Sequence, residues 1–185
     1  NEEDFYLQIQ RGVLFKMKLN ENGEVLTYNR MDPLGADTNN YEFIDYLAMD
    51  PNNDDILYFP NGKKLWRNNT SSQFEYNNSQ VRSNQGWELF SDTCKREITS
   101  LDVSTYPANT VYVGTSGKYI YKIENANSGD ASFTQISNLP TDFEANISAI
   151  EIDPTNDQRV LVLTSNYQSY SLFFTDNGGE SWKRV

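Results

Sequence analysis

The side chains that could do chemistry in this chain are carboxylates, hydroxyls, amides and aromatic rings, because histidine is absent and Cys94 is the only cysteine. The lack of histidine excludes a Ser-His-Asp triad, a Cys-His pair and any histidine-ligated metal within the chain. The run Asn52-Asn53-Asp54-Asp55 lacks the alternating ligand spacing of a calcium loop, and it predicts a solvated turn. We therefore expect no metal site, no cofactor and no catalytic residue in this chain.

Glycoside hydrolysis is the reaction class that this composition leaves open, because it needs only a pair of carboxylates. The chain has 26 acidic residues, and the sequence alone does not single out a pair. Asp45, Asp92 and Asp142 are the acids whose replacement would test for such an activity. Hydrolysis is accordingly the alternative hypothesis, and ligand binding without catalysis is the main one.

Short strands must position these side chains, and the sequence repeats them. An apolar pattern of the form Ile-x-x-Leu/Ile-x-Met/Val/Ile occupies residues 44–49, 98–103 and 147–152, and a Pro-x-Asn step follows each copy. Successive copies start 54 and 49 residues apart (98 − 44 and 147 − 98). A period of this size, filled with short strands, indicates a propeller or another array of repeats, because one such unit cannot bury its apolar face alone.

Each repeat predicts four strands, which is the content of a β-propeller blade. In the first full repeat we expect strands near residues 44–50, 56–60, 64–68 and 87–90. The N-terminal segment fits the same template from its second strand onward. The sequence thus predicts an all-β propeller of four-stranded antiparallel blades, with about three and three-quarters blades of a larger ring. The expected divisions are a partial blade (1–40), a blade with an insertion (41–92) and two further blades (93–140 and 141–185).

The string Thr-Asp-Asn-Gly-Gly-Glu-Ser-Trp at residues 175–182 fits the pattern Ser/Thr-x-Asp/Asn-x-Gly-x-Ser/Thr-Trp. The matching positions are Thr175, Asn177, Gly179, Ser181 and Trp182. The string resembles the Asp-box of the bacterial neuraminidase repeat superfamily, which includes sialidase-like and sortilin-like propellers. In such a motif the Asx side chain binds local backbone N–H groups, and glycine takes the left-handed conformation. The resemblance implies that these five residues are structural.

The resemblance is less specific for activity, because Asp-box propellers include sialidases, xyloglucan-cleaving glycosidases, receptor domains and assembly factors. A sialidase would need an arginine cluster, for which this chain shows no motif. The turn at residues 60–63 also lacks the aspartate expected in a xyloglucan-cleaving enzyme. We expect a non-catalytic binding or assembly module, with a segment of a glycoside hydrolase as the alternative. The resemblance further implies a secreted, cell-surface or periplasmic bacterial protein.

In such propellers the ligand face is formed by the loops that enter the first strand or join the second and third strands. Here these loops span residues 31–43, 59–64, 91–97, 114–118, 138–146 and 164–169. Aromatic side chains can stack on sugars or peptides, and charged groups can fix the orientation of a ligand. The ligand-binding candidates are Tyr41, Asp92, Arg96, Asp142 and Tyr167.

The charge of the chain limits its partners. A formal net charge of −11 opposes binding to nucleic acid or to anionic lipid. No run of residues is long and apolar enough to predict insertion into a membrane. The expected partners are a protein or glycan ligand and the rest of the parent propeller.

A polar insertion separates Trp66 from Trp87 in the second repeat. We expect a mobile hairpin extension there, and the alternative is a partner contact made through Phe74 and Tyr76.

Overall fold

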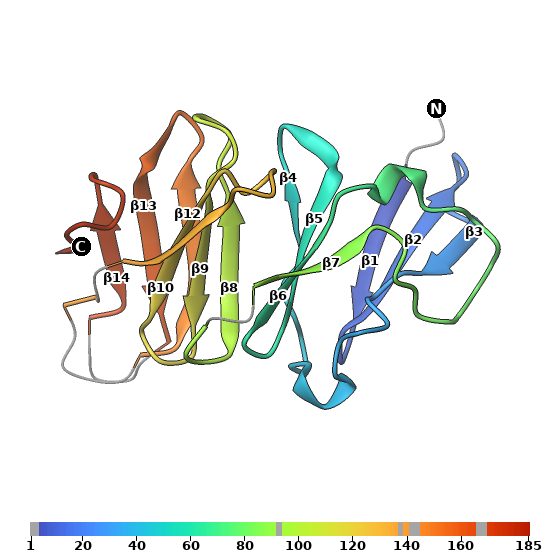
Figure 1. Ribbon diagram of the computed structural model, residues 1–185, viewed down its shortest axis with the longest axis horizontal. Helices are drawn as coiled ribbons and strands as arrows, with labels where there is room; N and C mark the ends of the chain where they lie inside the picture. The colour runs from blue at the N-terminus through green and yellow to red at the C-terminus, as the bar shows by residue number, and fades with distance from the viewer. Residues whose placement is uncertain (1–3, 92–93, 137–138, 141–144, 166–169) are drawn as a thin grey trace.

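The computed structural model describes residues 4–91, 94–136, 139–140, 145–165 and 170–185. Antiparallel strands form four sheets, and Figure 1 shows these sheets side by side in chain order, from the blue sheet at one end to the red sheet at the other. Helical structure in the described residues is restricted to two single 3-10 turns, η1 (Thr38–Asn40) and η2 (Ser71–Gln73). The predicted all-β class and the antiparallel blades are confirmed.

The sheets are simple meanders, in which strands adjacent in the sequence are hydrogen-bonded. The first sheet has three strands, β1 (Asp4–Ile9), β2 (Val13–Leu19) and β3 (Val25–Arg30). The second has β4 (Ala48–Asp50), β5 (Asn53–Asn61), β6 (Lys64–Asn68) and β7 (Trp87–Ser91). The third has β8 (Ile98–Val103), β9 (Val111–Thr115), β10 (Ile120–Glu124) and β11 (Ser132–Gln135). The fourth has β12 (Ile147–Asp153), β13 (Asn156–Thr164), β14 (Leu172–Thr175) and β15 (Lys183–Arg184).

The hydrophobic core lies between neighbouring sheets as three clusters. Successive side chains of a strand point to opposite faces, so a strand inside the stack feeds two clusters. On β5, for example, Leu57 joins the cluster shared with the first sheet, and Tyr58 joins the one shared with the third sheet. Both side chains are fully buried. This two-sided burial explains why β5 and β9 read as continuous apolar runs, whereas Leu161 and Leu163 of β13 are 41% and 43% exposed.

A tyrosine and a basic residue, directly opposite each other on neighbouring strands, reach from one sheet into the next. Tyr58 and Arg67 are such a pair on β5 and β6. The Tyr58 hydroxyl donates to the Ala126 carbonyl at 3.0 Å. The Arg67 guanidinium donates to the same carbonyl and, at 3.0 Å, to that of Ser128. The second sheet is thereby bound to the turn that follows β10 of the third.

The first and third sheets carry equivalent pairs. Tyr6 is opposite Lys16, which is fully buried and donates to the Ser71 and Ser72 carbonyls at 2.7 and 2.9 Å. Tyr112 is opposite Lys122, and the Tyr112 hydroxyl donates to the Asp157 carbonyl of the fourth sheet at 3.0 Å. We call Tyr6/Lys16, Tyr58/Arg67 and Tyr112/Lys122 the tyrosine–cation pairs. The equivalent positions in the fourth sheet are the apolar pair Leu161 and Phe174.

The strand expected near residues 44–50 is shorter than predicted. β4 begins only at Ala48, and the side chain of Ile44 is 71% exposed. The prediction for residues 44–47 was therefore wrong, although the other expected strands of this repeat, β5 to β7, lie where the pattern placed them.

The insertion between Trp66 and Trp87 packs against the first sheet. Phe74 is buried in the cluster between the first two sheets. Tyr76 donates a hydrogen bond to Asp4 at 2.6 Å, and the Lys16 ammonium lies 5.1 Å from the centre of its ring. Phe74 and Tyr76 are engaged within the chain, so neither the expected mobile extension nor the alternative, a partner contact through these two side chains, describes this segment.

The string at residues 175–182 folds into a hydrogen-bonded clip. The Asn177 side chain accepts from the Ser181 amide at 3.1 Å and donates to the Ser181 hydroxyl at 2.9 Å. The Thr175 hydroxyl accepts from the Gly179 amide at 3.0 Å. Gly179 has a φ of +89°, and a Cβ there would lie 2.3 Å from Ile136. The hydrogen bonds close the hairpin on itself, and Gly179 approaches Ile136, the residue after β11. Trp182 is buried in the cluster between the last two sheets.

Arg67→Met should lower the free energy of unfolding by about 2–3 kcal/mol, because the Ala126 and Ser128 carbonyls would lose charged donors at a buried interface. Denaturant melts of the purified chain measure this change. Arg159→Met is the matched control, since Arg159 is half exposed and pairs with Asp153 at the surface, and its cost should stay below about 1 kcal/mol. Equal effects of the two changes would contradict a structural role for the pair.

Trp182→Ala should destabilise the chain by about 3–5 kcal/mol, because it opens a cavity in the core between the third and fourth sheets. Thermal and denaturant melts check this value. Tyr106→Ala, at a side chain that is 68% exposed, serves as the control. A melting temperature within a degree or two of the wild type would show that the indole does not hold the sheets together.

Candidate functional site

A polar groove of about 580 Å³ opens where three loops meet at one end of the second sheet. The loops are the stretch around η1, the turn between β5 and β6, and the entry to β8. All three belong to the loops that the sequence placed on the ligand face. The lining residues are Asn39, Asn40, Tyr41, Glu42, Asn61, Gly62, Lys63, Lys64 and Glu97.

Backbone geometry sets the shape of the groove at the turn between β5 and β6. Gly62 has a φ of +61°, and a Cβ at this position would lie 3.1 Å from Asn40. Glycine therefore permits both the left-handed conformation and the close approach of η1. The Gly62 carbonyl accepts from the Ile98 amide at 2.8 Å, which joins this turn to the entry of β8.

A buried asparagine fixes the loop around η1. Asn61 is fully buried, and its side chain exchanges two hydrogen bonds with the Asp37 backbone, at 3.0 Å from the Asp37 amide and at 2.8 Å to the Asp37 carbonyl. The Asp37 carboxylate in turn accepts from the Asn39 amide at 2.9 Å. The position of Asn39 and Asn40 in the groove thus depends on side chains beneath it.

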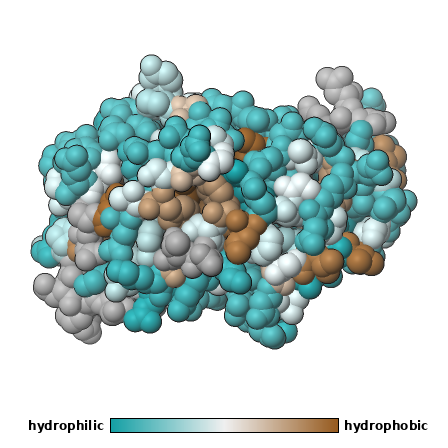
Figure 2. All heavy atoms as spheres, in the orientation of Figure 1, coloured by the Kyte–Doolittle hydropathy of each residue, from teal (hydrophilic) through white to brown (hydrophobic). Residues whose placement is uncertain are grey.

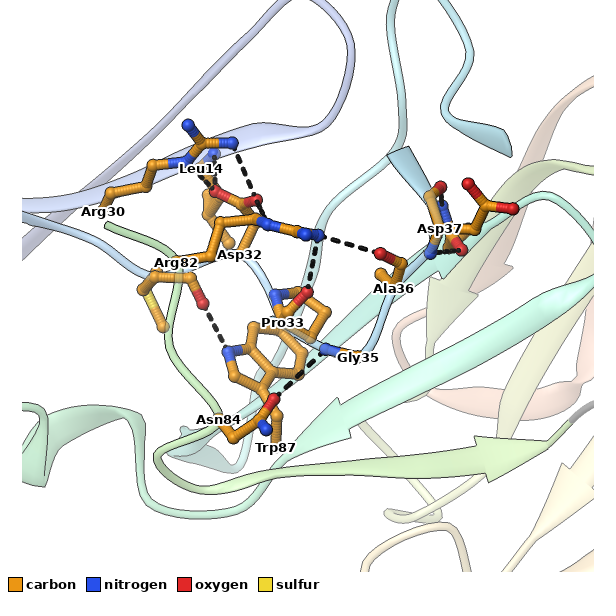
Figure 3. Close-up of polar contacts among 12 residues, drawn as sticks. Leu14, Arg30, Asp32, Pro33, Gly35, Ala36, Asp37, Arg82, Asn84 and Trp87 are labelled. Atoms are coloured by element: carbon orange, nitrogen blue, oxygen red, sulfur yellow. Dashed lines mark hydrogen bonds and ion pairs between the residues drawn. The ribbon is translucent and has the colours of Figure 1, made fainter. Parts of the chain in front are cut away.

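Figure 3 shows the ionic cluster that holds the preceding residues, 31–37. Asp32 is fully buried and accepts from Arg30 Nε at 2.7 Å. Arg82, from the insertion, donates to the Pro33 and Ala36 carbonyls at 3.2 and 2.8 Å. The insertion therefore acts as a support for this loop.

Tyr41 lines the groove but does not offer a free stacking face. Its ring centre lies 5.7 Å from that of Phe59, and the ring is so close to Gly12 that a Cβ there would lie 2.2 Å from it. Burial raises the pKa of the Tyr41 hydroxyl. This side chain forms part of the wall of the groove.

The two carboxylates of the groove have different surroundings. Glu97 has a lowered pKa, because its carboxylate accepts a hydrogen bond from its own backbone amide and one from the Ser116 hydroxyl at 3.0 Å. Glu42 is exposed on the opposite loop. Glu97 is therefore ionised at neutral pH and can accept hydrogen bonds from a ligand.

Asp45 lies beneath the groove and fixes Glu42. Its carboxylate accepts from the Glu42 amide at 3.0 Å and also interacts with the Gly12 backbone amide. Burial raises its pKa to about 6. Asp45 does not line the groove, so its position is one of support.

The structure brings two of the predicted ligand-binding candidates to this region. Tyr41 lines the groove, and Arg96 is exposed beside Glu97. Asp92, Asp142 and Tyr167 lie outside the described residues. The ligand-binding candidates did not include Glu42, Lys63 or Glu97, which the structure places in the groove. The only indication of such a role in the sequence was that each of them lies in a loop predicted to be on the ligand face.

The described residues contain no cluster of three potential metal ligands, and none of their helices is long and apolar enough to cross a membrane. Figure 2 shows a mainly hydrophilic face with hydrophobic residues gathered in limited patches.

No family model and no curated protein sequence matches this chain. Solved structures do. An ancestral GH74 enzyme aligns with a TM-score of 0.64 at 15% identity, over 98% of this chain and 22% of that one. A chain of the COPII outer coat vertex on membranes aligns with a TM-score of 0.60 at 13% identity, over 94% of this chain and 44% of that one.

The fold is that of propeller blades. At these identities the likeness extends to the fold alone. The chain spans less than half the length of either neighbour.

Replacing Asp45 tests the electrostatics beneath the groove. Its pKa is about 6 in the folded state against an ordinary 3.8, so the folded state retains a proton that the unfolded chain has already lost. The contribution of Asp45 to the free energy of unfolding is therefore fully present below about pH 4, falls as the pH rises to 6, and is absent above that. The Asp45→Asn variant lacks this loss. Its free energy of unfolding relative to that of the wild type should therefore increase by about 2–3 kcal/mol from pH 4 to pH 7.5.

Denaturant melts at both pH values measure the difference, with Asp130→Asn at an exposed position as the control for one lost charge. If the stability difference between Asp45→Asn and the wild type were the same at pH 4 and pH 7.5, Asp45 would ionise without a cost in stability.

Proposed function

We propose that this chain is a non-catalytic binding module that presents a polar groove to a glycan. The observation that carries the proposal is the groove of about 580 Å³, lined by amide, lysine and carboxylate side chains from three converging loops. Such groups donate and accept hydrogen bonds in several directions, which suits the many hydroxyls of a sugar. An extended polar peptide is the second ligand class that this lining fits.

The lining favours binding over catalysis. A glycosidase pairs an ionised carboxylate with a carboxylic acid whose pKa is raised. Glu97 suits the first role because its pKa is lowered. The nearby acid with a pKa raised to about 6 is Asp45, which is buried beneath the groove and does not line it. Asp45 is therefore not placed to act on a ligand in the groove as the second member of such a pair.

The alternative is a segment of a glycoside hydrolase, and two observations favour it. The fold resembles that of an ancestral GH74 enzyme, and Glu42 and Glu97 both line the groove. In this alternative, Glu97 would be the base or nucleophile and Glu42 the acid.

The setting of the module is part of the same proposal. The Asp-box pattern at residues 175–182 and the likeness to an enzyme of which this chain spans 22% support a part of a larger propeller. The Asp-box resemblance also supports a protein that is secreted or displayed at the cell surface.

Binding of xyloglucan and other β-glucan oligosaccharides to the purified chain, measured by calorimetry, tests the proposal, and sialosides form a second panel. Glu97→Gln and Lys63→Ala should each weaken binding at least about tenfold, because hydrogen bonds to charged groups contribute about 1.5–3 kcal/mol. Lys183→Ala is the matched control, since Lys183 is exposed on the hairpin at residues 175–184.

Two results would overturn this function. If Glu97→Gln and Lys63→Ala bound the ligand as tightly as Lys183→Ala does, the ligand would not bind in the groove. Release of reducing sugar that disappears in Glu42→Gln, with the fold retained, would establish the hydrolase in place of the binding module.

A further inference from the structure

The charged residues of the turns are divided between the two ends of the strands. At the end where the groove opens, the structure describes three turns in full, from β1 to β2, from β5 to β6 and from β9 to β10. Each of these turns contains a basic residue beside a glycine and contains no acidic residue. The three basic residues are Arg11, Lys63 and Lys118.

The turns at the opposite end have the reverse charge. Outside the insertion between β6 and β7, they contain five acidic residues and no basic residue. All of these acids are exposed, and they are Glu21, Glu24, Asp130, Asp176 and Glu180. An anion that approaches the protein is therefore attracted to the end of the strands that carries the groove.

The basic turns form one continuous rim with the loops that enter the neighbouring sheets. The Arg11 amide donates to the Phe43 carbonyl at 3.2 Å, and the Lys118 amide donates to the Ala145 carbonyl at 2.7 Å. The turn at Gly62 is joined in the same way to the entry of β8. Figure 1 shows the three turns along one edge of the row of sheets. The cations thus follow one another along this edge.

The entry of β8 adds two cations to the rim. Lys95 and Arg96 are both exposed. The Lys95 ammonium lies 5.1 Å from the centre of the Tyr119 ring, in the turn from β9 to β10. Besides the hydrogen bonds of Glu97, the positive charges of Lys63 and Arg96 lower the pKa of its carboxyl. With Lys64, which lines the groove, these residues make up the rim cations: Arg11, Lys63, Lys64, Lys95, Arg96 and Lys118.

The rim differs from the rest of the protein in how its cations are neutralised. Seven basic residues elsewhere form ion pairs within 4.0 Å: Lys16, Arg30, Arg67, Arg82, Lys122, Arg159 and Lys183. Among the described residues, no carboxylate lies within ion-pair distance of Arg11, Lys63, Lys64, Lys95 or Lys118. The charges of these five side chains can therefore act on a ligand.

We propose that the ligand of this edge is an acidic polysaccharide, whose carboxylate or sulfate groups bind the rim cations while its hydroxyls enter the groove. The inference rests on the proposed function of the groove and names the class of its ligand. Ammonium and guanidinium groups form charge-assisted hydrogen bonds with both kinds of anion. Since a basic residue recurs at the same turn of three successive sheets, a linear chain with repeated charges meets one cation after another.

The groove favours an acidic glycan over an acidic peptide. Glu42 and Glu97 line it beside the cations, and their carboxylates need hydrogen-bond donors. The hydroxyls of a sugar supply such donors, whereas the side chains of an acidic peptide are acceptors only. The formal net charge of −11 does not prevent this binding, because exposed charges farther away than about 8–10 Å are largely screened at physiological salt.

Calorimetric titration of the purified chain with a long oligogalacturonate, a polymer of uronic acid, tests the inference. Binding should be at least about tenfold tighter than that of the fully methyl-esterified oligomer, which has the same backbone without the charges. It should also weaken about tenfold between roughly 0.05 and 0.5 M NaCl. A sulfated galactan oligomer and its desulfated form make the same comparison for sulfate, and the pair with the larger difference identifies the anion.

The double variant Arg11→Gln/Lys118→Gln removes two rim cations that do not line the groove. It should weaken the binding of the acidic oligomer about tenfold and leave that of the uncharged oligomer unchanged. Arg159→Gln/Lys183→Gln is the matched control, because it removes the same two kinds of charge at exposed positions outside the rim. The control should bind both oligomers as the wild type does.

Three results would overturn the inference. The first is equal affinity for the charged and uncharged oligomers in both comparisons, which would leave the proposed binding of glycans by the groove intact. The second is equal weakening of binding by the two double variants, because the effect would then reflect total charge. The third is binding of oligoglutamate as tightly as oligogalacturonate, which would make the ligand an acidic peptide. If none of the charged or uncharged oligosaccharides bound, the proposed function of the groove would fail together with the inference.

Discussion

The tyrosine–cation pairs fix how the sheets stand against one another. Apolar packing between two sheets is tolerant of small slides, whereas a buried lysine or arginine must meet its acceptors with correct geometry. Arg67 meets the Ala126 and Ser128 carbonyls and Lys16 meets those of Ser71 and Ser72. In both interfaces the cation joins the sheet to a turn or insertion of its neighbour.

Different residues support the groove and line it. Asp32, Asn61 and Asp45 are buried, and they bind backbone groups of residues 14, 37 and 42. Lys63 and Glu42 are exposed on the loops that these contacts position. Replacing a buried residue should therefore disturb the loops as a whole, whereas replacing an exposed one should change ligand contacts alone. Because the ring of Tyr41 is packed on Phe59, we expect Tyr41 to be a poorer probe of binding than Glu97.

The fold could be predicted because the signal is repeated. The apolar runs of β5, β9 and β13 and the turns that follow them recur, and each copy supports the interpretation of the others. The groove was less predictable, because its lining residues share no spacing and meet only when three loops converge. Glu97 directly precedes β8, and nothing in its neighbours distinguishes it from other surface acids. The insertion was misjudged for a similar reason, since the polar sequence around Phe74 conceals a side chain that is 4% exposed in the core.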